Sequence, residues 1–159
     1  MEKETQRLYL MPGQLWAGKQ RTEITTILGS CVAVCLWDKD LKIGAMNHFL
    51  LPMWTMSDLQ SPKFGNIAIE KIVEQIYSLG SKNSPLVAKI FGGAKLFGND
   101  NNLNVGQKNV EMALTMLEKF QIPVAAQSTG GNNGRKIIFD TYTGIVQMKY
   151  IENKIHKTK

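Results

Sequence analysis

The chain has 159 residues, 43% of them hydrophobic and 20% charged, and its formal net charge is +6 at pH 7. This length and composition predict one globular domain over residues 1–159, with a sizeable buried core. The 19 Lys and Arg are scattered, and no nucleic-acid-binding motif accompanies them, so we expect an acidic protein partner and no nucleic acid. No apolar run approaches the roughly 20 residues that cross a bilayer, and the first residues lack a signal peptide's apolar core, so we expect a cytoplasmic protein without membrane insertion.

The first half of the chain has the composition of a sheet. Three segments rich in β-branched and aromatic residues follow one another, separated by Gly29-Ser30 and by Asp38-Lys39-Asp40. They predict strands at 23–28, 32–37 and 43–51. After Pro52 comes a stretch rich in Met, Ser and Pro, at 53–65, for which we expect a mobile flap.

Two helices are expected in the second half. Apolar residues recur at spacings of three and four from Ile69 to Leu79, with Asn66 as the candidate cap and Gly80 as the stop. A second helix is expected at 105–120. The remaining apolar segments predict strands at 86–91, 124–127, 136–139 and 145–151. Strands and helices do not alternate as in a doubly wound sheet, so we expect an α+β fold, with a mixed β-sandwich core and both helices on one side.

The two cysteines are expected to be free thiols. Cys31 and Cys35 lie four residues apart on one predicted strand, about 13 Å between Cα atoms, which is too far for a disulfide. The two histidines are His48 and His156. Two cysteines and two histidines with this spacing do not form a zinc motif, and we expect neither a metal nor a cofactor.

The spacing of Cys31 and His48 suggests that they meet on one sheet face. If Lys39 and Asp40 form a two-residue hairpin turn, residue 31 pairs with residue 48, with Cβ atoms about 5 Å apart. Asp-Lys-Asp is not a favoured two-residue turn, so a longer loop or a bulge would shift this register.

A cysteine and a histidine in contact form a nucleophile and its base. The turn at Gly29 and Ser30 would place backbone N–H groups where they face a developing oxyanion. Thr25, Thr26 and Asn47 are the local candidates for orienting the imidazole. On this hypothesis the Cys31 thiol titrates well below 8.5.

The alternative is that these residues only fill the core. A cysteine in an apolar strand is most often a packing residue, and we assign Cys35 that role. The glycine-rich pieces at 91–94 and 129–136 have no phosphate-loop spacing, so we expect turns there.

The segments LGSCVAVCLWD and IGAMNHFLLP closely resemble the signature of CheD, the bacterial chemoreceptor glutamine deamidase family. The likeness continues in order through KFGNIAIEKIVEQIYSLG, AKIFGGAKLF, NVGQKNVEMALTMLEKFQIPVAAQ and TGGNNGRKIIF. By this resemblance Cys31 is the nucleophile, His48 the base and Thr25 the catalytic threonine. It implies a protein-glutamine deamidase that acts on chemoreceptor cytoplasmic domains through a Cys thioester, without a cofactor. It also implies a fold shared with a glutamine-deamidating toxin domain.

Two segments depart from the family pattern. The acidic residue usual before Thr-Gly-Gly is replaced, since the chain has Gln127-Ser128-Thr129, and the usual Arg-Tyr-Gly-Asp is Lys63-Phe64-Gly65-Asn66. We expect both segments on a substrate or partner surface, with Phe64, Gly65, Thr129 and Gly130 as its candidate residues. Some family members bind the phosphatase CheC, so the alternative function is a non-catalytic module that regulates a CheC-type partner.

Overall fold

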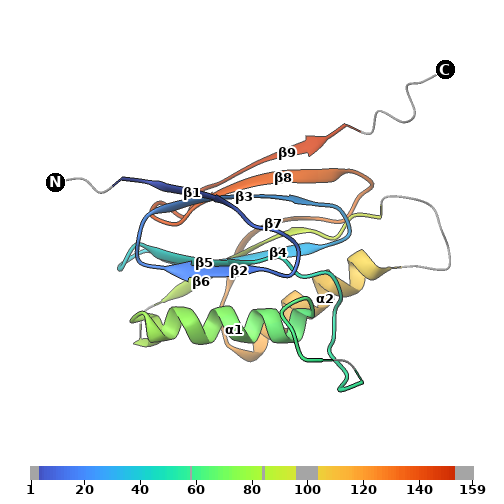
Figure 1. Cartoon of the computed structure of the whole chain (residues 1–159), viewed down its shortest axis with the longest axis horizontal. Helices are drawn as coiled ribbons and strands as arrows, with labels where there is room; N and C mark the ends of the chain where they lie inside the picture. Colours follow the sequence, from blue (N-terminus) through green and yellow to red (C-terminus); the bar gives the residue numbers. More distant parts are fainter. Residues whose placement is uncertain (1–3, 58, 84, 96–103, 153–159) are drawn as a thin grey trace.

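The computed structural model describes residues 4–57, 59–83, 85–95 and 104–152. The chain folds into three layers: a four-stranded sheet, a five-stranded sheet and a layer of two helices (Figure 1). In chain order the elements are β1 (Gln6–Tyr9), β2 (Leu15–Gly18), β3 (Thr22–Leu28), β4 (Val32–Asp38), β5 (Ile43–Asn47), α1 (Gly65–Ser78), η1 (Ser81–Asn83), β6 (Leu86–Gly92), α2 (Val105–Lys119), β7 (Val124–Thr129), β8 (Gly134–Asp140) and β9 (Val146–Ile151).

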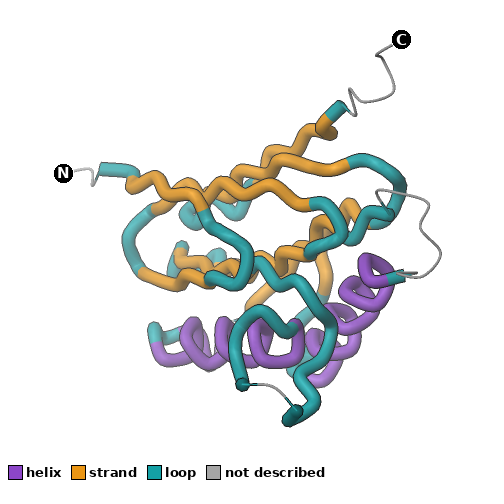
Figure 2. Tube along the Cα trace, turned by 45° about the vertical axis from the view of Figure 1, so that its right-hand side comes forward, coloured by secondary structure: helices purple, strands orange, loops and turns teal. Residues whose placement is uncertain are grey.

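Both sheets are mixed. The first has the strand order β1-β3-β8-β9 and the second β2-β5-β4-β6-β7. Each holds one parallel pair, β1 with β3 and β6 with β7, and its other pairs are antiparallel. Helices α1 and α2 both pack on the second sheet (Figure 2). The expected α+β class, with mixed sheets and two helices on one side, is confirmed. Among the described residues, no helix is long and apolar enough to cross a membrane.

The expected helices are present, but one cap is wrong. Helix α1 begins at Gly65, so Asn66 lies in its first turn and Phe64 takes the N-cap position. The Asn66 side chain has another task, because its Oδ1 accepts the Trp54 N–H at 2.9 Å and ties the flap to the helix. The expected stop is confirmed at Gly80, which has a positive φ of 121°.

The strands differ from expectation at the N-terminal end. Strands β1 and β2 were not predicted. Each has only four residues, and neither shows the alternation of buried and exposed side chains that marks a strand. Strand β5 ends at Asn47, and the expected continuation to residue 51 is wrong. After Asn47 only isolated bridges at Phe49 and Leu51 remain.

Strand β4 divides the core into two. Its side chains at Val32, Val34 and Leu36 belong to the cluster under the helices, whereas Ala33 and Cys35 belong to the cluster between the sheets. This alternation follows from the period of two in a strand. Cys35 is therefore a buried core thiol, as expected.

The β4–β5 hairpin has a longer loop than the predicted two residues. Asp38 pairs with Ile43, which leaves residues 39–42 in the loop. The Asp38 carboxylate fixes this loop, since its Oδ1 accepts the N–H groups of Asp40 and Leu41, both at 2.9 Å. The expected pairing is therefore wrong by two residues. A shift of two keeps every side chain on its predicted face.

The glycine-rich piece at 91–94 is not the expected turn, because its first two residues end β6, but it supports Cys31. The Gly93 N–H donates to the Cys31 carbonyl at 2.9 Å. Gly92 has a φ of +112°, and a Cβ atom there would overlap the Cys31 carbonyl oxygen. Only glycine fits this close approach of two backbones.

We predict that Gly92→Ala destabilises the protein by about 3 kcal/mol or more, because overlap adds to backbone strain. Gly130→Ala is the matched control. Gly130 also has a positive φ, +81°, but a Cβ atom there would meet nothing within 4 Å, so only the backbone strain of about 1 to 2 kcal/mol applies. Urea unfolding measures both. Equal losses would show that the contact with Cys31 adds nothing.

Candidate active site

Cys31 and His48 lie on the same face of the second sheet, toward the first sheet. Val32 is opposite Phe49, and continuing this register places Ala33 opposite His48. Cys31 and His48 are thus diagonal neighbours, not the directly opposed pair that we expected. Diagonal neighbours on one face have their Cα atoms roughly 7–8 Å apart, within reach of long side chains. Cys31 is half-buried and packs against the inter-sheet core.

The backbone at His48 is held from both sides. Its N–H donates to the Gln14 carbonyl at 3.2 Å, and its own carbonyl accepts the Gly13 N–H at 2.7 Å. On the opposite side, the Asn47 side-chain Oδ1 accepts the Val34 N–H at 2.9 Å, so a side chain makes the link to β4. These bonds fix the imidazole's position at the end of β5.

A hydrogen-bond chain through Thr26 fixes the imidazole tautomer. The Thr26 Oγ1 lies 2.6 Å from the Leu10 carbonyl oxygen and 2.8 Å from the His48 Nδ1. The Leu10 carbonyl can only accept, so the hydroxyl proton points to it. Thr26 must then accept from His48, which places the ring proton on Nδ1. His48 Nε2 is left with its lone pair, buried and without a partner among the described residues.

Thr25 does not make the contact that the family resemblance assigned to it. Side chains alternate along β3, and Ile24, Thr26 and Leu28 are buried against the second sheet. Thr25 therefore lies on the opposite face of β3, away from His48. The expectation that Thr25 hydrogen-bonds the imidazole is wrong. Thr26 was one of three candidates from spacing, and strand alternation is the signal that distinguishes it.

Burial keeps both members of the pair neutral. It lowers the pKa of His48 from 6.5 to about 4. It also raises the pKa of the Cys31 thiol, and the opposing effect of the residue's own backbone N–H is smaller. The expected low thiol pKa is wrong for the free protein, because a neutral imidazole provides no positive charge to hold a thiolate. The resting site holds a thiol beside a neutral base.

The turn at Gly29 and Ser30 is fixed through its carbonyl groups. The Gly29 carbonyl accepts the Ala94 N–H at 2.9 Å, and the Ser30 carbonyl accepts the Asn109 Nδ2 at 3.0 Å. Among the described residues, no other residue accepts from the N–H groups of Ser30 and Cys31, and the Cys31 N–H faces its own sulfur. Both donors thus lie next to the thiol. Asn109 was not among the residues that we singled out from the sequence.

Two residues expected on a recognition surface are instead structural. Phe64 and Gly65 are buried, and a Cβ at Gly65 would overlap the ring of Phe49, so their expected exposure is wrong. They anchor the flap where it enters α1. Thr129 and Gly130 are half-buried near the end of β7, and their role in recognition stays a prediction.

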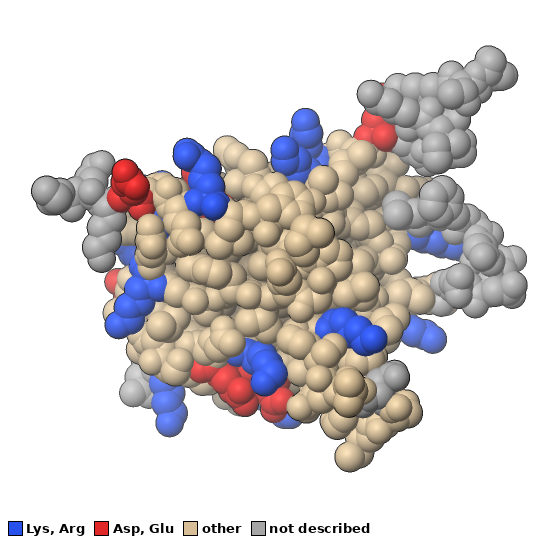
Figure 3. Space-filling view, viewed as in Figure 1, with Lys and Arg blue, Asp and Glu red and all other residues tan. Residues whose placement is uncertain are grey.

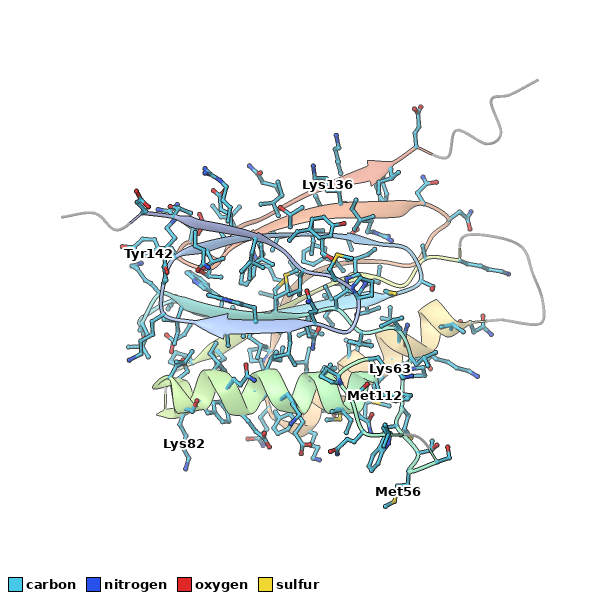
Figure 4. The ribbon with its side chains drawn as sticks, viewed as in Figure 1. Met56, Lys63, Lys82, Met112, Lys136 and Tyr142 are labelled. Carbon is cyan, nitrogen blue, oxygen red and sulfur yellow. The ribbon has the colours of Figure 1, made fainter. Side chains whose placement is uncertain are left out.

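The flap itself is exposed and apolar. Met53, Met56 and Leu59 have exposed fractions of 52%, 79% and 90%. Figure 4 places Met56 far out on the flap, with Lys63 and Met112 closer to the body of the protein. The flap therefore presents flexible, apolar side chains to solvent at the helical side of the molecule.

Ser128, where the chain departs from the family pattern, contacts a buried arginine. Arg135 is 2% exposed, its Nε donates to the Ser128 Oγ at 3.0 Å, and its guanidinium lies 5.1 Å from the ring centre of Tyr150. A weaker bond joins it to the Gly92 carbonyl at 3.4 Å. Ser128 thus serves the packing around Arg135, and a role of this segment in recognition stays a prediction. Among the described residues, no group of three or more His, Cys, Asp and Glu could hold a metal ion.

A family model described as CheD chemotactic sensory transduction matches residues 50–150. The chain belongs to this CheD family. A protein of Trichlorobacter lovleyi named as a probable chemoreceptor glutamine deamidase CheD is 47% identical over 141 residues, 88% of each chain. A protein of the same name from Sulfurimonas denitrificans is 42% identical over 94% of this chain and 97% of its own. Spans of this length include residues 31 and 48.

We predict that His48 makes the protein less stable in acid. Its pKa is about 4 in the folded state and 6.5 ordinarily, so below pH 6.5 the unfolded chain binds the proton first. The free energy of unfolding is therefore highest above pH 6.5, where the ring is neutral in both states. It falls by about 2 to 3 kcal/mol as the pH drops toward 4.

The measurement is urea unfolding at pH 7 and pH 4.5 for the wild type and for His48→Gln, which cannot titrate. The wild type should lose about 2 kcal/mol more than the variant between the two conditions. Equal losses in the two proteins would contradict the depressed pKa of His48.

Proposed function

We propose that the chain is a protein-glutamine deamidase that converts glutamine side chains of chemoreceptor cytoplasmic domains to glutamate. Cys31 is the nucleophile and His48 is the base. The relatives' names support the activity, and one observation carries the roles: the His48 Nε2 lone pair is buried and unpartnered, on the sheet face that also carries Cys31. A buried acceptor without a partner lowers the folding stability by about 1 to 3 kcal/mol. Proteins keep such groups mainly where they have a chemical role.

In the first half of the reaction, one proton moves from the thiol to His48 and then from His48 to the leaving nitrogen. As the Cys31 Sγ attacks the glutamine carbonyl carbon, His48 Nε2 takes the thiol proton. The negative charge that develops on the carbonyl oxygen is stabilised by the N–H groups of Ser30 and Cys31. When the C–N bond breaks, the imidazolium returns its proton to the leaving nitrogen, and ammonia departs. A thioester between Cys31 and the substrate remains.

The second half restores the thiol. Water attacks the thioester carbon while His48 Nε2 takes one of its protons. The C–S bond then breaks, sulfur recovers a proton from the imidazolium, and glutamate is released. Thr26 supports both halves, because its Oγ1 accepts from Nδ1 in the neutral ring and in the imidazolium alike. Residues in this pattern need no cofactor for the steps described.

Recognition of the receptor is proposed to use the flap and the positive charge. Lys and Arg lie apart from one another over the face in Figure 3, rather than in one cluster. Scattered charges accelerate the encounter with an acidic partner but supply little affinity individually. The exposed methionines at positions 53 and 56 are adaptable contacts for a helical surface.

Three finer proposals rest on the family resemblance alone. They are a cytoplasmic location, a CheC-type phosphatase as a second partner, and a fold shared with the glutamine-deamidating toxin domain. The mixed sandwich with helices on one side is compatible with the last of these.

Incubation with a purified receptor cytoplasmic fragment tests the function, with peptide mass mapping to find deamidated glutamines. Cys31→Ala and His48→Ala should each lower the rate by at least about 10³-fold, because each removes a group that reacts. Cys35→Ala is the matched control and should retain activity, since Cys35 is a core thiol on the same face. Full activity in either of the first two variants would exclude the mechanism.

The two neighbouring threonines give a second test. Thr26→Val removes the hydroxyl that orients His48, a bond to a charged group worth about 1.5 to 3 kcal/mol, so kcat should fall roughly 10- to 100-fold. Thr25→Val is the control and should change kcat less than about twofold. Steady-state kinetics on the receptor fragment measure both. The reverse order of effects would restore Thr25 as the orienting residue.

A further inference from the structure

Beyond Val32 and Phe49 the sheet opens into two arms. These two residues exchange the last pair of ladder hydrogen bonds, at 3.1 and 2.9 Å. The next N–H groups on one side, from Leu50 and Leu51, donate to the Lys63 carbonyl at 2.9 and 3.1 Å. We call the opening between residues 29–31 and residues 50–51 the fork. Cys31 lies on one arm, and His48 lies just before the other.

Asn109 of α2 joins the two arms of the fork. Its Nδ2 donates to the Ser30 carbonyl and to the Leu50 carbonyl, both at 3.0 Å. Ser30 directly precedes Cys31. Among the described residues, no other hydrogen bond connects residues 29–31 with residues 50–51. One amide group is therefore the direct hydrogen-bonded link between the arms in the described part of the chain.

The position is costly for a residue that only packs. Asn109 is 0% exposed, and its Oδ1 is buried without a partner among the described residues. Such an orphaned acceptor is unfavourable, whereas both protons of the amide nitrogen are used. The side chain is thus suited to joining two carbonyls and poorly suited to filling a core.

We propose that Asn109 is a positioning residue for the deamidation reaction, which holds Cys31 at its working distance from His48 by closing the fork. The inference rests on the proposed roles of Cys31 and His48. It has a kinetic consequence, because a small displacement of a nucleophile from its base slows the chemical step without weakening substrate binding. A residue that merely stabilises α2 would have no such selective effect.

The test compares Asn109→Ala with Leu117→Ala, a buried residue of α2 that contacts neither arm through a hydrogen bond. Both variants should lower the melting temperature. On the receptor fragment, Asn109→Ala should lower kcat about 100-fold with KM nearly unchanged, whereas Leu117→Ala should keep kcat within about twofold. Equal kcat values in the two variants would overturn the proposal.

Asn109→Asp keeps the shape of the side chain and adds a pH readout. An ionised carboxylate has no proton to donate to either carbonyl, but a protonated one has a single O–H. The kcat of Asn109→Asp should therefore rise, relative to wild type, as the pH falls from 8 toward 5.5. A constant ratio would count against the proposal, and this variant serves also if Asn109→Ala fails to fold.

Alkylation of Cys31 tests the positioning role of Asn109 separately from the proposed deamidase function. Iodoacetamide labelling followed by peptide mapping needs no receptor. Opening the fork exposes the half-buried thiol, so Asn109→Ala should label at least about threefold faster than wild type, and Leu117→Ala should not. If Asn109→Ala labels faster than wild type but the wild type deamidates no receptor fragment, the proposed function is contradicted and the role of Asn109 in closing the fork is not. If Asn109→Ala labels at the wild-type rate, the role of Asn109 in closing the fork is contradicted.

Discussion

The hydrogen bond between the Thr26 hydroxyl and the His48 ring is the contact on which the site depends. It joins the two sheets of the sandwich, since Thr26 belongs to β3 and His48 follows β5. It also sets the protonation of the ring, because the Leu10 carbonyl takes the hydroxyl proton and leaves Thr26 as an acceptor only. The Thr26 Oγ1 therefore both links the two sheets and orients the imidazole, and neither sheet alone could orient the ring.

The remaining architecture brings Cys31 to the sheet face that carries His48. The two-residue alternation of β4 turns Cys31 toward the first sheet, and the helices cover the other face. Gly93, directly after β6, donates to the Cys31 carbonyl, while α2 reaches the preceding residue through Asn109. The Cys31 backbone is thus supported from the helical side, while its thiol packs against the cluster between the sheets. Helix α2 therefore contributes to the site without presenting a reacting group.

Periodicity made the helices, the central strands and the shared face of Cys31 and His48 predictable. The exact pairing was not, because the Asp38 side chain stabilises a four-residue loop that no turn motif announces. Family resemblance selected Thr25, and strand alternation in the structure selected Thr26. Asn109 could not be found from the sequence, since its partners are backbone carbonyls at residues 30 and 50, far away along the chain. Contacts made by the backbone leave little trace in a sequence.

The neutral state of the resting site has a consequence for survival of the enzyme. Peroxides and other cellular electrophiles react with the thiolate form of cysteine, and a protonated, half-buried thiol is a poor target for them. On the proposed mechanism the sulfur becomes a strong nucleophile only while a carbonyl carbon is within reach and His48 can take its proton. The burial that raises the energy of the charged pair thus also protects the cysteine from oxidation between turnovers.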